Sequence, residues 1–207
     1  MNLTFSRPSD ILIVSLLLYE SGEEMSDKVK LIGFSGSLRK QSYNSQLLRE
    51  CQRLLADVAD VQIFDLGSLP FYNQDLDSNV PPVVVDLANE VRQAAGVILV
   101  TPEYNYSYSG VMKNMLEWLS RQCTGAPLID KPAAVMGATL GAFGTTRGQR
   151  HLRDVLFSIG VRAVGKPEVY VSFANQKFDA NGRLTDQPTV DFMLQHLHQL
   201  IAMGRSS

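Results

Sequence analysis

Residues 33–44 read Gly33-Phe34-Ser35-Gly36-Ser37-Leu38-Arg39-Lys40-Gln41-Ser42-Tyr43-Asn44, and the rest of the fold is arranged around them. A short apolar run precedes this stretch and an apolar pattern of helical spacing follows it, an order that predicts strand, tight turn and helix. Glycines let such a turn bend sharply, while hydroxyls, backbone N–H groups and a helix N-terminus suit a phosphate. Arg39 adds a fixed positive charge with a forked set of donors. We therefore predict that this loop holds the phosphate group of a small ligand.

The spacing of the glycines separates this loop from three better-known ones. No glycine is followed by Lys and then Ser or Thr, as the nucleoside-triphosphate loop requires. No third glycine follows Gly33 and Gly36 at the dinucleotide-binding spacing, and Ser37 stands where a hydrolase nucleophile elbow needs its last glycine. A mononucleotide loop of the flavodoxin type fits the order of elements. The alternative is an ordinary serine-rich connection in which Ser42 or Asn44 caps the helix.

The composition is that of one ordinary globular domain. The chain has 207 residues, of which 45% are hydrophobic and 19% charged, and this length can bury a sizeable core. A net charge of −2 gives neither the basic field of a nucleic-acid-binding protein nor the acidic surface of a dedicated electron shuttle. Cys51 and Cys123 have no C-x-x-C spacing. We predict that Cys51 is buried on an apolar helix face, and that the protein is cytoplasmic.

The first residues are predicted to lie outside the fold. Residues 11–19 form an apolar stretch that is shorter than the roughly 20 residues of a membrane span, so no membrane association is expected. The stretch also lacks the basic start and the small-residue cleavage site of a secretory signal. Met25 stands just before the first expected strand and could be the natural start. We therefore divide the chain into an N-terminal extension, residues 1–27, and one domain, residues 28–207.

Short apolar runs and helical apolar stripes alternate five times along the chain. Residues 97–100 form a continuous apolar run, as in a strand that is covered on both faces of a parallel sheet. The alternation predicts an α/β fold, with helices on both faces of the sheet and right-handed crossovers. The expected strands are 29–34, 61–64, 97–100, 133–137 and 168–171, and the expected helical stripes are 47–58, 81–95, 111–119, 152–159 and 190–201.

Three segments that follow expected strands are rich in Gly, Ser, Asn or Tyr. They are residues 36–44, 101–110 and 138–148. Ligands of such sheets bind beyond the carboxyl ends of the strands, where the strand order reverses, so we expect the three loops to form one crevice. The first loop would hold a phosphate and the other two would flank a planar ring, with Asn105 bonding to ring atoms and Tyr104 or Tyr106 packing on the ring.

Two motifs, in this order, resemble those of the NAD(P)H-dependent FMN reductases, in particular the bacterial quinone and chromate reductases. The first is Gly36-Ser37-Leu38-Arg39-x-x-Ser42-x-Asn44; the second is Pro102-Glu103-Tyr104-Asn105-Tyr106-Ser107, with Met112-Lys113-Asn114 after it. The resemblance extends over about residues 28–200. It implies a flavodoxin-like three-layer sandwich with a five-stranded parallel sheet in 2-1-3-4-5 order.

The resemblance implies bound FMN as cofactor and NADPH or NADH as co-substrate. The first motif would bind the FMN phosphate, the second would edge the isoalloxazine ring, and the third loop would lie against the far edge of that ring. The implied cofactor-binding residues are Ser37, Leu38, Arg39, Ser42, Tyr43 and Asn44, then Pro102, Glu103, Tyr104, Asn105 and Tyr106, and finally Ala138, Gly141 and Gly144.

The implied chemistry belongs to the flavin. NAD(P)H would pass a hydride to FMN and leave, and an acceptor would then take two electrons at the same place, in a ping-pong sequence. The implied acceptors are quinones, chromate, azo compounds, ferric chelates or free flavin. No catalytic side chain and no metal is required, and we interpret the histidines as non-catalytic because partners for a triad are missing. They are His151, which we expect to begin a helix, His196 and His198.

Relatives of this kind are usually dimers or tetramers with the flavin near the dimer contact, so a homodimer or homotetramer is implied. Met112, Met115 and Trp118 would then face a partner subunit or, alternatively, belong to the core. The basic cluster 147–153 is interpreted as a solvated face, and pairing with an acidic residue such as Glu168 across a subunit contact is the alternative.

Two other functions stay open from the sequence. One is a flavin-binding electron carrier or sensor without turnover of its own. The other is a serine hydrolase that uses Ser35 or Ser37 with His151 as base, although the spacing of the nucleophile elbow is missing. Steady oxidation of NADPH with a quinone would favour the reductase over both.

Overall fold

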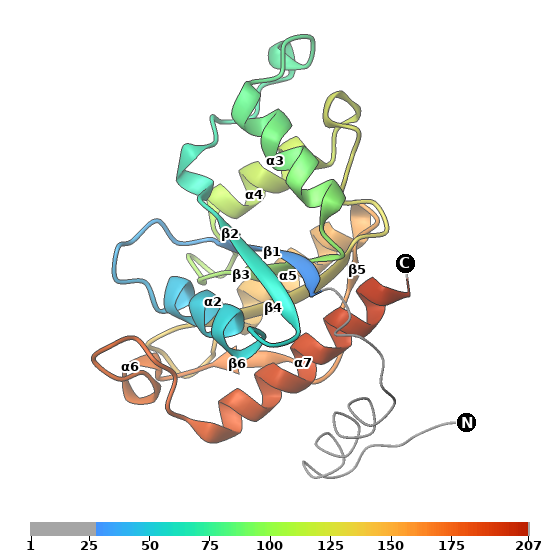
Figure 1. Cartoon of the computed structure of the whole chain (residues 1–207). Coiled ribbons are helices and arrows are strands. Elements are labelled where there is room, and N and C mark those ends of the chain that lie inside the picture. The colour runs from blue at the N-terminus through green and yellow to red at the C-terminus, as the bar shows by residue number, and fades with distance from the viewer. Residues whose placement is uncertain (1–27, 207) are drawn as a thin grey trace, which may run out of the picture.

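One parallel sheet runs through the middle of the molecule (Figure 1). The computed structural model describes residues 28–206, so the predicted extension, residues 1–27, lies outside the described residues. The strand order is β2-β1-β3-β4-β5, and β6 also pairs with β4. The predicted α/β fold and its strand order are therefore confirmed. The strands are β1 Val29–Ser35, β2 Ala59–Phe64, β3 Gly96–Val100, β4 Pro132–Ala138, β5 Arg162–Ala163 and β6 Val169–Val171.

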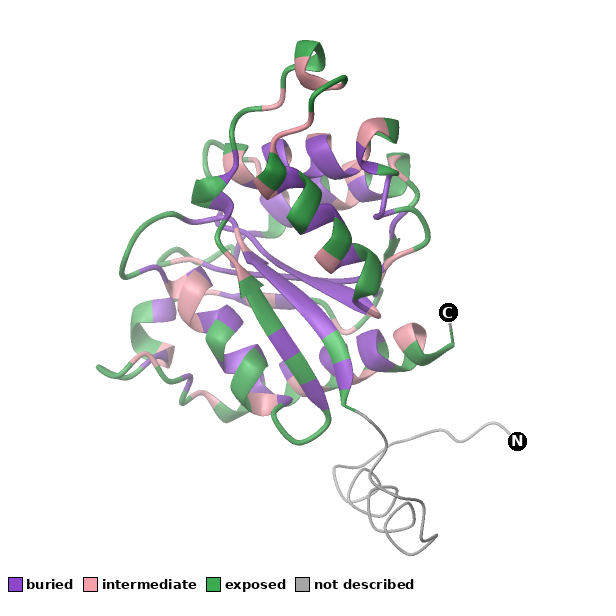
Figure 2. Cartoon of the chain, turned by 45° about the horizontal axis from the view of Figure 1, so that its top comes forward, coloured by how far each residue is buried: buried purple, intermediate pink, exposed green. Residues whose placement is uncertain are grey.

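Helices cover both faces of this sheet and make three layers (Figure 1). α2 and α7 pack on one face, and α3, α4 and α5 pack on the other. β3 and β4 are buried along their whole length, whereas β2 alternates between buried and exposed residues at the sheet edge (Figure 2). The helices are α2 Tyr43–Leu54, α3 Pro82–Gln93, α4 Gly110–Leu119, α5 Thr146–Ser158, α6 Ala174–Lys177 and α7 Gln187–Arg205, with short 3-10 turns η1 Leu66–Ser68, η2 Gln74–Leu76 and η3 Gln122–Thr124.

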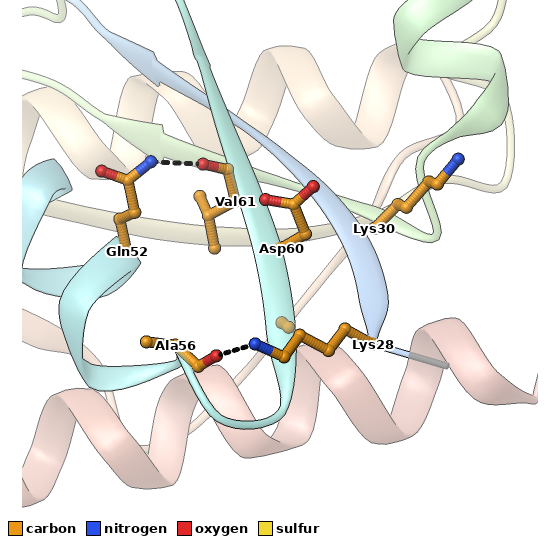
Figure 3. Close-up of a pocket in the computed structure, with 7 residues that line it drawn as sticks. Lys28, Lys30, Gln52, Ala56, Asp60 and Val61 are labelled. Carbon is orange, nitrogen blue, oxygen red and sulfur yellow. Dashed lines mark hydrogen bonds between the residues drawn. The ribbon is translucent and has the colours of Figure 1, made fainter. Parts of the chain in front are cut away.

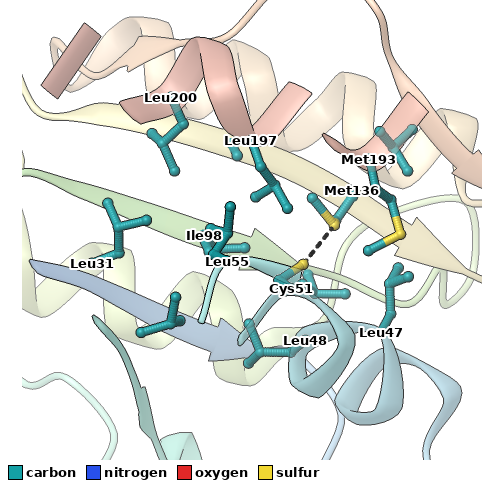
Figure 4. Packing of buried hydrophobic residues seen from close by; sticks show 14 of the residues in the cluster. Leu31, Leu47, Leu48, Cys51, Leu55, Ile98, Met136, Met193, Leu197 and Leu200 are labelled. Carbon is teal, nitrogen blue, oxygen red and sulfur yellow. Dashed lines mark hydrogen bonds between the residues drawn. The ribbon is translucent and has the colours of Figure 1, made fainter. Parts of the chain in front are cut away.

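Cys51 lies in the core between α2, α7 and the sheet (Figure 4). Its side chain is fully buried, and its Sγ is 3.5 Å from Sδ of Met136 on β4. Burial raises the pKa of the Cys51 thiol well above its usual range, so the residue acts as an apolar packing group. The predicted burial of Cys51 is confirmed.

The packing of α4 on the opposite face of the sheet shows whether its large apolar residues belong to the core or face a partner subunit. Met112, Met115 and Trp118 are fully buried against the sheet and α3. They belong to the core, and the alternative that they face a partner subunit is wrong. The same helix anchors a distant loop, because Trp118 Nε1 and Asn114 Nδ2 each donate to the carbonyl oxygen of Pro70, both at 2.9 Å.

The fifth strand position is divided into two short pieces. The sequence predicts one strand over 168–171, but β5 and β6 pair with opposite halves of β4. Between these halves, the backbone N–H of Val135 donates to Nε2 of His196 on α7, at 3.1 Å. A side chain therefore takes the place of a strand carbonyl, which the apolar pattern does not reveal.

Two helix boundaries also differ from the expected ones. α2 ends at Leu54, so Val58 lies in the turn before β2, where it is 41% exposed, and does not belong to the buried stripe. α5 begins at Thr146, which places His151 in the middle of the helix rather than at its start. Both errors arise because capping groups, not apolar spacing, decide where a helix begins and ends.

Candidate functional site

The first and second loops are in direct contact beyond the carboxyl ends of β1 and β3. The backbone N–H of Gly36 donates to the carbonyl oxygen of Val100 at 2.8 Å. A Cβ on Gly36 would lie 2.5 Å from Ser109 Oγ and 3.1 Å from Pro102 Cδ. Only glycine leaves room for this approach.

The third loop joins the other two through Asn44, which is buried near the start of α2. Its Oδ1 accepts from the backbone N–H of Ala138 at 2.9 Å, and its Nδ2 donates to the carbonyl oxygen of Ala138 at 3.0 Å. These two hydrogen bonds tie the first loop to the end of β4. The three loops therefore meet at the carboxyl end of the sheet, and Asn44 holds the first of them to the third.

The first loop carries hydrogen-bond donors that have no acceptor within residues 28–206. They are the hydroxyl of Ser37, which is 8% exposed, and the backbone N–H groups of residues 38–41. The guanidinium of Arg39 is exposed, forms no ion pair in the same part of the chain, and lies 6.0 Å from the ring centre of Tyr43. Free donors and a positive charge fit a phosphate dianion, so this loop suits the phosphate of FMN.

Ser42 joins this loop to the helix that follows it. It is the N-cap of α2, and its hydroxyl oxygen accepts from the backbone N–H groups of Asn44 and Ser45 at 3.2 and 3.4 Å. The cap is therefore Ser42 and not Asn44, and the capped helix N-terminus adds its positive end to the phosphate site.

The second loop presents its aromatic side chains on a tight turn. The backbones of Tyr104 and Ser107 bond to each other in both directions, at 2.8 and 3.0 Å, and Asn105 and Tyr106 between them have positive φ angles of 49° and 69°. Tyr104, Asn105 and Tyr106 are exposed, whereas Pro102 is buried. The turn can therefore offer ring faces and an amide to a planar ligand.

Glu103 has a contact that the sequence did not predict. Its Oε2 accepts from the backbone N–H groups of Arg147 and Gly148 in the first turn of α5, at 2.9 and 3.1 Å, and its Oε1 lies 3.3 Å from Nη1 of Arg147. A carboxylate at a helix N-terminus is stabilising, and the N-cap of α5, Thr145, makes no side-chain cap bond of its own. Arg147 therefore forms its ion pair with Glu103 of the same chain.

The third loop combines a buried start with an open middle. Ala138 is buried at the end of β4, and Gly144, with φ of 56°, would place a Cβ 2.8 Å from the backbone carbonyl carbon of Tyr170. Gly141 is exposed, and nothing lies within 4 Å of the place of its Cβ. The third loop is therefore open at Gly141, while Gly144 is required by the packing of the loop on β6.

The histidines do not assemble a hydrolase triad. His151 Nδ1 lies 3.3 Å from Ser107 Oγ, whereas the hydroxyl of Ser35 is 2.9 Å from that of Ser45. Arg153, in the basic cluster, lies 4.0 Å from Glu168 of the same chain. Within the described chain, no cluster of three or more His, Cys, Asp or Glu side chains is placed to hold a metal ion, and no helix has the length and apolar character needed to cross a membrane.

A cavity of about 610 Å³ lies at the other end of the sheet (Figure 3). It opens beside the amino ends of β1 and β2, where Lys28 Nζ donates to the carbonyl oxygen of Ala56 and Gln52 Nε2 donates to that of Val61, each at 2.7 Å. Ligands of parallel sheets bind at the carboxyl ends of the strands, so this cavity is not the candidate site.

Comparisons with known proteins identify the family of the chain. A model of the family described as NADPH-dependent FMN reductase matches residues 29–176. The chain is 42% identical over 177 residues to an NAD(P)H-dependent FMN reductase of Pseudomonas aeruginosa, covering 85% of this chain and 95% of the relative. It is 35% identical over 184 residues to a quinone reductase of Escherichia coli, covering 87% of this chain and 96% of the relative.

A solved structure of a related flavoenzyme has a similar fold. The flavoenzyme NAD(P)H:(acceptor) oxidoreductase FerB from Paracoccus denitrificans superposes with a TM-score of 0.79 at 30% identity, covering 86% of this chain and 98% of that one. The resemblance inferred from the two motifs is confirmed. With its sheet order, its three converging loops and its matching sequence, the chain belongs to the NADPH-dependent FMN reductase family.

Proposed function

We propose that this chain catalyses two-electron transfer from NADPH or NADH, through FMN, to small-molecule acceptors, with quinones as the main class. The observation that carries the proposal is the set of unpartnered donors in the first loop, at the edge of the sheet where three loops meet. Relatives named as quinone reductases support the choice of acceptor. Chromate, azo compounds, ferric chelates and free flavin are further candidates.

The residues of this chain bind and orient, while bound FMN supplies the hydride and electron transfer. Ser37, Arg39, Ser42 and the backbones of Leu38 and Tyr43 are assigned to the phosphate. Pro102–Tyr106 are assigned to the ring, and Ala138, Gly141 and Gly144 to its far edge. Within these sets, Asn44 and Glu103 are assigned positioning roles, because Asn44 holds Ala138 and Glu103 holds the start of α5.

Replacing Arg39 by alanine should weaken FMN binding by about ten- to hundredfold, as expected for a lost charge-assisted hydrogen bond. The dissociation constant is measured by quenching of FMN fluorescence on titration with apoprotein. Arg49→Ala is the matched control, because Arg49 is an exposed arginine on the neighbouring helix α2. Equal loss of affinity in both variants would show that net charge, and not the first loop, governs FMN binding.

The activity itself is tested with the purified protein. We expect a flavin absorbance spectrum and steady oxidation of NADPH when a quinone is added. Flavin binding without turnover would favour the carrier or sensor, and a colourless sample that reacts with a fluorophosphonate would favour the hydrolase. A panel of acceptors, assayed with both nicotinamides, then ranks the substrates.

A homodimer or homotetramer is proposed for the assembled protein. Tyr104, Tyr106, Leu140 and Phe143 are exposed on the second and third loops, and an exposed apolar patch of this kind favours association. Light scattering coupled to size exclusion measures the mass of the particle. A cytoplasmic location is proposed because Cys51 and Cys123 are both free thiols.

A further inference from the structure

Arg147 connects the second loop to the third. It lies in the first turn of α5, and its guanidinium carbon is 4.2 Å from the ring centre of Tyr106 and 4.4 Å from that of Phe143. Tyr106 belongs to the turn of the second loop and Phe143 to the third loop, and both rings are exposed. A guanidinium over an aromatic ring is held by the ring quadrupole, so one side chain fixes two rings.

Glu103 fixes Arg147 in turn. One carboxylate oxygen accepts from the backbone N–H of Arg147 and the other lies 3.3 Å from its Nη1. The side chain of Glu103 is only 14% exposed, so water screens this pair less than it screens a surface pair. Arg147 is therefore held by Glu103 at both its backbone N–H and its side chain, which favours the position of its guanidinium beside the two rings.

The backbone beside Arg147 is strained on both loops. Asn105 and Tyr106 have positive φ angles in the second loop, and Thr145 has a φ of 67° immediately before α5. Residues other than glycine keep such conformations only where their surroundings hold them. The Arg147 contacts lie beside these residues, which indicates that they help to hold the two loops in this arrangement.

We propose that Arg147 is a positioning residue that sets the separation of the Tyr106 and Phe143 rings and so shapes the place where the acceptor approaches the flavin. The inference rests on the proposed function, which puts the flavin ring between these loops. Arg147 touches no reacting atom in this account. It acts through the two aromatic side chains, with Glu103 as its anchor.

The test compares Arg147→Ala and Phe143→Leu as FMN-loaded enzymes with NADPH and 1,4-benzoquinone. Arg147→Ala should raise the KM for the quinone by about tenfold, the equivalent of losing two cation–π contacts, with a smaller change in kcat. Phe143→Leu, which leaves Glu103 and Arg147 in place, should raise the same KM by about threefold. The visible circular dichroism of the bound flavin should change in both variants.

Two further variants separate positioning from stability. Arg147→Lys keeps a cation beside Glu103 but loses the planar group, so it should keep the melting temperature and still raise the KM for the quinone. Arg150→Ala removes an exposed arginine three residues further along α5 and should leave both unchanged. If Arg147→Ala does not fold, the lysine and leucine variants still decide.

The inference is overturned if Arg147→Lys and Phe143→Leu leave the KM within about twofold and the flavin spectrum unchanged. Arg147 would then only cap and stabilise α5. Failure of the proposed function gives a different result, because the unmodified protein itself would then bind no FMN or reduce no quinone.

Discussion

Replacing Gly137 by alanine is expected to lower the free energy of unfolding by about 3 kcal/mol and to abolish measurable FMN binding. Gly137 lies near the end of β4, and a Cβ there would be 2.2 Å from Thr145 Oγ1 and 2.3 Å from the carbonyl oxygen of Thr101. The Thr145 hydroxyl can rotate away, but the Thr101 carbonyl belongs to the backbone after β3. The added methyl group would push β3 and β4 apart where the second and third loops leave the sheet. Urea unfolding of the apoprotein and FMN fluorescence titration measure the two effects.

Gly110→Ala is the matched control for this substitution. Gly110 is the first residue of α4, and nothing lies within 4 Å of the place of its Cβ. Alanine is favourable in a helix, so we expect a change below about 0.5 kcal/mol and normal FMN binding. If Gly137→Ala proved as stable as Gly110→Ala, the tight contact between the ends of the two strands would not be needed for the fold.

The sheet could be predicted because its central strands are buried on both faces. Runs such as 97–100 and 133–137 are continuous and apolar, which predicts strands covered on both faces of a parallel sheet. The 2-1-3-4-5 order of the strands is implied by the resemblance to the FMN reductases and not by these runs. The division of the fifth strand could not be predicted in this way. It depends on His196, which meets Val135 across 61 positions of sequence, and local apolar patterns carry no information about such a partner.

In the candidate site, too, the sequence identified residues of interest but did not reveal which residues they contact. The motif marks Asn44 as a ligand, but both ends of its amide bond to Ala138, 94 positions away. The motif marks Glu103 as a ring contact, but its carboxylate binds the start of α5, 44 positions away. One weak signal for the second pairing exists in the sequence, because the first turn of α5 contains no acidic residue of its own.

The protein is expected to lose about 3 kcal/mol of stability through His196 alone as the pH falls from about 6.5 to about 4. Burial lowers the pKa of His196 to about 4 in the folded chain, from 6.5 in the unfolded chain. A folded-state pKa below the unfolded one means that the unfolded chain takes up the proton first. The contribution is therefore complete above pH 6.5 and is lost as the pH falls through this window. Burial also lowers the pKa of His198, which adds to the loss in the same direction.

The variant His196→Gln isolates this contribution, because a glutamine oxygen can accept the Val135 N–H without titrating. Arg153 on α5 and Glu168 before β6 both face His196; the arginine lowers its pKa and the carboxylate raises it, so their effects oppose each other and burial dominates. Urea unfolding at several pH values between about 7 and 4.5 should give a stability curve for the unmodified protein that falls more steeply than that of the glutamine variant. Parallel curves would mean that His196 is already charged in the fold or reaches water. The hydrogen bond from Val135 excludes a charged His196 in the folded chain, because a doubly protonated imidazole has no acceptor for the Val135 N–H. That N–H belongs to β4, between the residues that pair with β5 and those that pair with β6.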